Sequence, residues 1–142
     1  SPRLRLDLLI NDFVFQVVKN NYVVVYEKSF MRTFLHVRDI AKAILFSMEN
    51  RDEMLNNVYN VGSDEMNMSK EQIVLLLKEY RPDYYLHFAE VGTDEDKRDY
   101  VVSYEKIRKL GFDTTVSIRE GIEELLRVID VVDLPRSIYS NV

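Results

Sequence analysis

The 142-residue chain contains no cysteine, no tryptophan, three prolines, four glycines and two histidines. Without cysteine it has no disulfide, no thiol nucleophile and no thiolate metal site. With only His36 and His87 as imidazole donors, a metal site would have to be built from carboxylates, and no tight carboxylate cluster is present. We therefore expect no bound metal, and the lack of disulfides fits a reducing, cytoplasmic location.

Long apolar runs are also missing. No segment approaches the roughly 18–20 apolar residues that a membrane-spanning helix requires, and no cationic leader precedes a small-residue cleavage site. The net charge is −5, with acidic and basic residues interspersed rather than gathered in a basic stripe. We expect neither a membrane nor a nucleic-acid partner, whereas a phosphate-bearing small molecule needs only one or two well-placed arginines.

The scarcity of glycine excludes a complete dinucleotide-binding domain. Such a domain needs closely spaced glycines where the backbone approaches the pyrophosphate, and no two of Gly62, Gly92, Gly111 and Gly121 lie within that span. The chain also lacks a Tyr-x-x-x-Lys pair and the glycines of a nucleophile elbow. No catalytic residue and no cofactor site is therefore predicted in this chain alone.

What is present is the composition of a globular domain. Hydrophobic residues make up 46% and charged residues 30%, and this length is enough to bury a core. We therefore treat residues 1–142 as a single domain. The chain opens at Ser1 without an initiator methionine, so we expect a processed, clipped or partial gene product.

Periodicity and capping residues predict short helices and strands in alternation. Asp39 is a candidate helix cap, and Ser69 with Gln72 and Ser117 with Glu120 form two capping boxes. The pattern predicts an α/β fold, α+β-like, without a complete Rossmann domain. The predicted helices span 6–18, 40–49, 69–81, 103–110 and 117–132, the predicted strands 22–26, 33–37, 58–61, 84–91 and 100–102, with a polar loop at 92–97 and an irregular tail from 133.

Three segments, in order, resemble a known family. Arg32-Thr-Phe-Leu-His-Val-Arg-Asp-Ile-Ala-Lys-Ala-Ile44 is similar to the pattern Arg-x-Phe-x-His/Tyr-Val-x-Asp-x-Ala-x-Ala. Val58-Tyr-Asn-Val-Gly-Ser63 is similar to a strand and turn with Tyr/Phe-Asn-Val/Ile-Gly. Residues 98–112 are similar to Arg-x-Tyr-x-x-Asp/Ser-x-x-Lys-Ile-x-x-x-Leu-Gly-Phe/Trp. Together with Ser1-Pro-Arg and Asn11-Asp-Phe, they resemble the extended short-chain dehydrogenase/reductase family of nucleotide-sugar epimerases and dehydratases over most of residues 1–125.

The resemblance implies a function for the chain and its parent. The chain would be the C-terminal, substrate-binding part of an NAD-dependent epimerase/dehydratase that acts on a nucleoside-diphosphate sugar. NAD and the catalytic tyrosine would belong to an N-terminal Rossmann domain outside this chain, so the chain alone would be inactive. A stand-alone, non-catalytic binding or interaction domain is one alternative, and part of a related reductase is another.

The resemblance also assigns binding roles to individual residues. Arg32 and Arg98 would grip the diphosphate, since guanidinium groups bind phosphate oxygens through paired, charge-assisted hydrogen bonds, and Asn11 would contact phosphate or sugar. Each residue has a structural alternative: Arg32 as a surface arginine, Arg98 in an ion pair with the acidic residues 94–96, and Asn11 as an interruption of an apolar helix. His36 is interpreted as structural. The loop 27–31 departs from the glycine-rich loop of many relatives, which leaves base and sugar unassigned.

Two further features carry a structural and a functional interpretation. The aromatic residues Tyr84, Tyr85 and Phe88 could stack a base, but aromatic residues on a strand usually belong to a core. Separation from a Rossmann domain should expose an apolar face, for which the helix from Leu6 to Val18 is the candidate. We expect self-association through that face.

Overall fold

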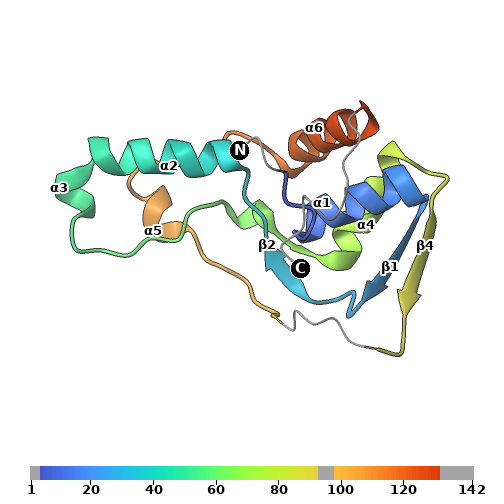
Figure 1. Cartoon of the computed structure of the whole chain (residues 1–142). Coiled ribbons are helices and arrows are strands. Elements are labelled where there is room, and N and C mark those ends of the chain that lie inside the picture. Colours follow the sequence, from blue (N-terminus) through green and yellow to red (C-terminus); the bar gives the residue numbers. More distant parts are fainter. Residues whose placement is uncertain (1–3, 93–97, 132–142) are drawn as a thin grey trace. The chain divides into compact units, whose positions relative to one another are not determined.

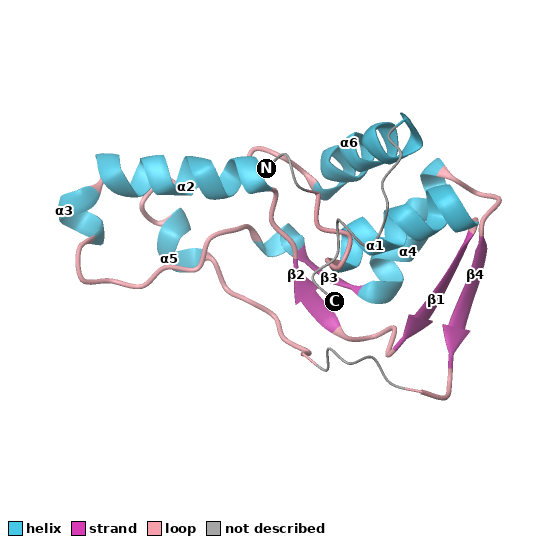
Figure 2. Ribbon diagram, viewed as in Figure 1, coloured by secondary structure: helices cyan, strands magenta, loops and turns pink. Residues whose placement is uncertain are grey.

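The computed structural model describes residues 4–92 and 98–131 and consists of short helices and strands (Figures 1 and 2). The expected mixed α/β class is confirmed, and the strands form two small sheets. The elements in chain order are α1 Leu9–Phe15, a π-helical turn Gln16–Asn20, β1 Tyr22–Tyr26, β2 Met31–Thr33, α2 Val37–Glu49, α3 Arg51–Met54, a 3₁₀ turn Asp64–Met66, β3 Asn67–Ser69, α4 Lys70–Tyr80, β4 Tyr85–Ala89, α5 Glu105–Arg108 and α6 Ile118–Val131.

The chain divides into two compact units, each built from separate stretches of sequence. The first unit combines residues 1–29, 70–97 and 119–142, and the second combines residues 30–69 and 98–118. The assignment of the whole chain to a single substrate-binding domain stays a prediction.

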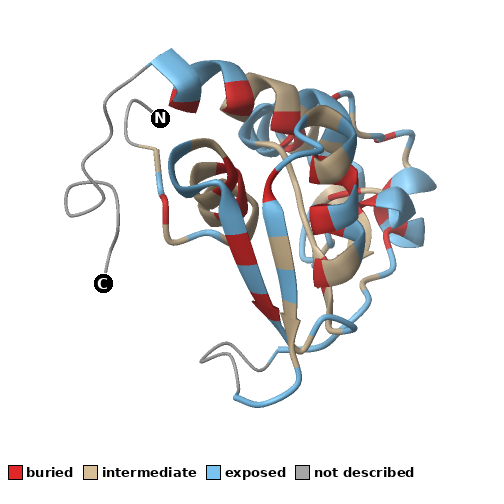
Figure 3. Cartoon of the chain, turned by 90° about the vertical axis from the view of Figure 1, so that its right-hand side faces the viewer, coloured by how far each residue is buried: buried red, intermediate tan, exposed pale blue. Residues whose placement is uncertain are grey.

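In the first unit, β1 and β4 form a parallel pair in which Tyr22 lies opposite Tyr85. The strand β1 alternates between exposed and buried residues, as a half-covered strand requires (Figure 3). Val23 and Val25 are each only 1% exposed. The chain enters β1 through Asn21, which adopts a left-handed conformation with φ of 58°. The strand predicted at 22–26 is confirmed.

The core of the first unit is supplied mainly by α1, α4 and α6. The apolar side chains that face inward are Phe13, Val14, Val17, Ile73, Val74, Leu76, Leu77, Ile122, Leu126 and Ile129. Tyr84, just before β4, is 2% exposed and its hydroxyl donates to the carbonyl of Val74 at 2.6 Å. Burial raises the pKa of Tyr84 to about 12, so this hydroxyl stays a neutral hydrogen-bond donor inside the core.

In the second unit, β2 and β3 pair antiparallel, with Met31 opposite Ser69 and Thr33 opposite Asn67. A hydrophobic cluster forms around α2 and α5 and contains the buried residues Ala43, Tyr104, Ile107 and Phe112. Phe46 of α2 packs edge-to-face on Phe112, with ring centroids 5.4 Å apart. Packing of this kind fixes a short helix such as α5, which propensity alone would not stabilise.

The helix predicted at 40–49 begins earlier, at Val37, and the strand predicted at 33–37 is displaced to 31–33. The reason is local, because the Nδ1 atom of His36 accepts from the backbone N–H of Arg38 at 3.2 Å and caps the helix there. The cap predicted at Asp39 is therefore wrong. His36 supplies the cap instead.

Two predicted strands, 58–61 and 100–102, are not strands among the described residues. Both contain residues with high β-propensity, but a strand exists only when a neighbouring backbone completes its hydrogen-bond ladder. The segment 100–102 is bonded largely by side chains, as described below. The polar loop predicted at 92–97 lies mostly outside the described residues, as does the tail from 133.

Candidate functional site

Arg32 occupies the centre of β2, opposite Met68, and is only 5% exposed. Its Nη1 donates to the carbonyl of Met31 at 3.0 Å, and its guanidinium carbon lies 5.9 Å from the ring centroid of Tyr100. The interpretation of Arg32 as a surface residue is therefore wrong. A buried guanidinium is costly unless hydrogen bonds and π-contacts hold it, and these contacts fix where its donors point.

Arg98 lies in the same unit as Arg32 and is exposed. The next residue, Asp99, accepts a hydrogen bond from the backbone N–H of Met31 at 2.7 Å, and the N–H of Tyr100 donates to the carbonyl of Met31 at 3.2 Å. The segment that begins with Arg98 is thus attached to the residue that directly precedes Arg32. The acidic residues 94–96 of the alternative reading lie outside the described residues.

Asn11 lies on α1 in the first unit. Its side-chain Nδ2 donates to the carbonyl of Arg5 at 2.7 Å, which fastens the start of the helix to the chain before it. This contact supports the structural reading of Asn11, although its Oδ1 remains an acceptor of suitable chemistry for a sugar hydroxyl. Its predicted role in substrate binding stays a prediction.

Asp39 is fully buried within the second unit. Its carboxylate accepts from the backbone N–H of Thr115 at 2.9 Å, from the Thr115 hydroxyl at 2.7 Å and from the N–H of Val116 at 3.1 Å. Burial alone would raise the pKa of Asp39, but the hydrogen bonds from Thr115 and Val116 outweigh it and hold the pKa below its ordinary value. Asp39 is an ionised structural carboxylate that ties α2 to the segment leading into α6.

The aromatic cluster predicted near β4 does not act as one surface. Tyr84 belongs to the core, whereas Tyr85 is 66% exposed and stacks its ring on His87 with centroids 6.4 Å apart. Lys28 lies over the ring of Phe88, with Nζ 4.8 Å from the centroid. These residues have different environments, so the core interpretation holds for Tyr84 alone.

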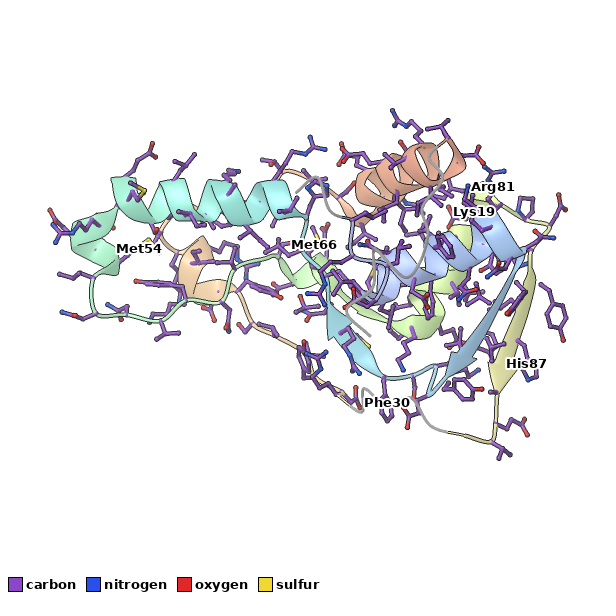
Figure 4. The ribbon with its side chains drawn as sticks, in the orientation of Figure 1. Lys19, Phe30, Met54, Met66, Arg81 and His87 are labelled. Atoms are coloured by element: carbon purple, nitrogen blue, oxygen red, sulfur yellow. The ribbon has the colours of Figure 1, made fainter. Side chains whose placement is uncertain are left out.

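Asp99, Tyr100 and Asn67 had no role predicted from the sequence, yet Asp99 and Tyr100 bond to Met31, the neighbour of Arg32. Asp99 and Tyr100 lie within the third family-like segment, so the motif itself marked their neighbourhood. Asn67 carried no signal, because its importance follows only from the β2–β3 pairing that brings it opposite Thr33. Met66, labelled in Figure 4, completes this neighbourhood: its carbonyl accepts from the N–H of Phe34 at 3.0 Å.

The glycines of this chain do not form a cradle for a dinucleotide. Gly62 lies against Tyr104, Gly92 lies against Tyr26, Gly111 follows the end of α5, and Gly121 lies inside α6. None stands at a turn from a strand into a helix, where a pyrophosphate would meet backbone N–H groups. No residue of this chain is assigned to the cofactor.

Within residues 4–92 and 98–131, no group of three or more histidine or acidic side chains is placed to hold a metal ion. None of the helices in those ranges has the length and hydropathy needed to cross a membrane.

Comparison with known proteins agrees with these observations. Residues 4–62 match the model of the NAD dependent epimerase/dehydratase family. The resemblance to this family is confirmed over these residues. The matched range includes Asn11, Arg32 and the whole of α2. It covers the first two family-like segments except for Ser63 and does not reach the third.

Solved structures share the fold. The UDP-glucose 4-epimerase of Thermus thermophilus, determined with NAD, superposes with a TM-score of 0.70 at 19% identity over 88% of this chain. An NAD-dependent NDP-hexosamine 5,6-dehydratase of tunicamycin biosynthesis gives 0.70 at 22% identity over 91%. The ADP-L-glycero-D-manno-heptose-6-epimerase of Helicobacter pylori gives 0.68 at 20% identity over 87%. The chain spans only 40%, 42% and 38% of the length of these three proteins.

Proposed function

We propose that this chain is the substrate-side part of an NAD-dependent nucleotide-sugar epimerase/dehydratase and that Arg32 and Arg98 bind the diphosphate. One observation carries the proposal: both arginines belong to one unit, and the segments that bear them are hydrogen-bonded to each other through Met31. Two guanidinium groups from adjacent segments suit a ligand with two neighbouring phosphates.

The chemistry of the parent enzyme follows from this division of labour. NAD and the proton-transferring residues belong to the remainder of the parent protein, and this chain supplies binding energy at the non-reacting end of the substrate. Such energy positions the sugar ring for reaction when the anchor is rigid. The hydrogen bonds around Arg32 support this role because they limit the movement of its guanidinium. A cytoplasmic location remains a prediction.

Replacing Arg32 with alanine should weaken binding of UDP by about tenfold to a hundredfold, because hydrogen bonds to charged groups contribute about 1.5–3 kcal/mol. Isothermal titration calorimetry with UDP measures this loss. Arg32→Lys keeps the charge but loses the forked geometry, so we expect an intermediate affinity. Arg119→Ala is the matched control. Arg119 is exposed, lies in the first unit and forms an ion pair with Glu79 of that same unit.

Circular dichroism would show whether each variant remains folded, which matters because Arg32 is buried. If folded Arg32→Lys and Arg98→Ala variants bind UDP as tightly as the unaltered chain, the diphosphate assignment is wrong. Uridine, which lacks phosphate, provides a second control, since its binding should not depend on either arginine.

We further propose that α2 mediates self-association. Val37, Ile40, Ile44, Leu45 and Met48 are between 45% and 69% exposed, and the spacing of Val37, Ile40, Ile44 and Met48 places these four on one helical face. The expected helix from Leu6 to Val18 is not this face, because Leu6, Phe13, Val14 and Val17 are buried. An apolar stripe of this size favours a partner surface over solvent.

Sedimentation velocity over a range of concentrations should therefore show a dimer or larger species. The double variant Ile44→Glu/Met48→Glu should sediment as a monomer, because charges placed in an apolar interface are desolvated without partners. Val131→Glu is the control, since Val131 is 82% exposed but lies on α6 in the other unit. A chain that remains monomeric at high concentration contradicts the proposal.

A further inference from the structure

The segment 98–103 has no regular secondary structure, yet its backbone is held at several points. At its start, the Oδ1 of Asp99 accepts from the N–H of Met31 at 2.7 Å, and the N–H of Tyr100 donates to the carbonyl of Met31 at 3.2 Å. These two bonds satisfy both backbone groups of Met31 on the side of β2 that faces this segment. The segment therefore lies along β2 without forming a ladder of its own.

Further along, Asn67 takes the place of a strand partner. Its Oδ1 accepts from the N–H of Val102 at 2.9 Å, and its Nδ2 donates to the carbonyl of Val102 at 2.9 Å. A carboxamide carries one acceptor and two donors, so it can satisfy both backbone groups of one residue as a neighbouring strand would. The same Nδ2 also reaches the carbonyl of Asp64 at 3.2 Å, which orients the side chain.

The two attachments bracket the part of the chain that follows Arg98. Met31 holds Asp99 and Tyr100, and Asn67 holds Val102, so little freedom remains between them. The carbonyl of Met31 also accepts from Nη1 of Arg32 at 3.0 Å, and the ring of Tyr100 lies against the Arg32 guanidinium. One carbonyl thus connects the backbone beside Arg98 with the side chain of Arg32.

We propose that Asn67 and Asp99 are positioning residues, which hold the segment bearing Arg98 against β2 so that both arginines are arranged for a diphosphate before it binds. This inference rests on the proposed function and adds residues that would not touch the ligand. Its physical basis is entropic, because a backbone residue that is ordered in advance does not lose its conformational freedom at the moment of binding.

The test is a double-mutant cycle with UDP as the ligand, read by calorimetry on the full chain. Asn67→Ala alone should weaken binding about tenfold, which corresponds to ordering one further residue. In an Arg98→Ala background, Asn67→Ala should cause at most a small further loss, because the segment that Asn67 holds no longer carries an arginine. Asn57→Ala is the matched control, an exposed asparagine of the same unit that bonds to Leu55 and Lys106 instead.

A conservative variant separates positioning from charge. Asp99→Asn keeps an oxygen that accepts from the N–H of Met31, so UDP binding should be retained, whereas Asp99→Ala should lose about as much as Asn67→Ala. Hydrogen exchange gives an independent reading on the free chain. The amide of Val102 should exchange at least tenfold faster in Asn67→Ala, because its hydrogen bond to Asn67 is lost.

The outcomes distinguish the two proposals. If Arg98→Ala weakens UDP binding but the effects of Arg98→Ala and Asn67→Ala add, Asn67 does not act through Arg98, and the inference fails while the proposed function stands. Unchanged exchange at Val102 in Asn67→Ala also overturns it. If neither arginine contributes to UDP binding, the proposed function fails and the inference fails with it.

Discussion

The Asp39→Ala variant should lose about 3–5 kcal/mol of its free energy of unfolding, because removing a buried partner leaves donors unsatisfied at about 1–3 kcal/mol each. The carboxylate accepts two backbone bonds and one hydroxyl bond from Thr115 and Val116. Replacing it leaves the N–H groups of Thr115 and Val116 without their acceptor. Urea denaturation followed by circular dichroism measures the difference.

Asp113→Ala is the matched control for this experiment. Asp113 is exposed, and its Oδ1 accepts only from the N–H of the neighbouring Thr114, so its loss should cost less than about 1 kcal/mol. If the two variants lose similar amounts of unfolding free energy, the hydrogen bonds between Asp39 and the segment before α6 do not stabilise the fold beyond an ordinary surface contact.

The pH dependence of stability provides a second measurement on the same pair of proteins. The pKa of Asp39 is lowered in the folded state, so its contribution is fully present above the ordinary carboxyl pKa and is lost as the pH falls through the lowered value. Unaltered protein should therefore lose this stability below about pH 4. In Asp39→Ala that part of the acid dependence should be absent.

The Gly62→Ala variant should lose about 3 kcal/mol, the sum of a backbone and a packing penalty. Gly62 has φ of 151°, and a Cβ atom there would lie 2.6 Å from Cε1 of Tyr104. Tyr104 is 2% exposed and its hydroxyl is hydrogen-bonded to that of Thr33, so its ring has no room to move away. Thermal or urea unfolding measures the loss.

Gly111→Ala separates the two penalties. Gly111 also has positive φ, at 92°, but a Cβ atom there would meet nothing within 4 Å. It should therefore lose only the backbone penalty of about 1 kcal/mol. Equal losses in the two variants would mean that the contact with Tyr104 is not strained.

Local patterns predicted the elements that carry their own signals. The β-branched run at 22–26 and the capping box before α4 gave a strand and a helix that the structure contains. The start of α2 was misplaced because Asp39 was taken as its cap, whereas His36 caps the helix in the structure. Sequence could not show that Asp39 finds better partners at Thr115 and Val116, since those bonds join residues 76 and 77 positions apart.

The candidate site was predicted only in part, because some of its residues stand in local motifs and others depend on contacts between distant parts of the sequence. Arg32 and Arg98 stood in motifs and were found in one unit. The residues that hold them, Asn67 above all, are ordinary in sequence and acquire a role only through the pairing of β2 with β3. Likewise, nothing in the amphipathic pattern of 40–49 indicated that its apolar face would lie exposed while that of α1 is buried.

The contacts that meet at Met31 limit which substitutions this position can accept during evolution. It pairs with Ser69 in the ladder and receives Asp99 on its N–H, so the polypeptide between those residues departs from and returns to the same point. A substitution at Met31 that shifts its backbone would therefore disturb the pairing of β2 with β3 and the attachment of the segment bearing Arg98 at the same time.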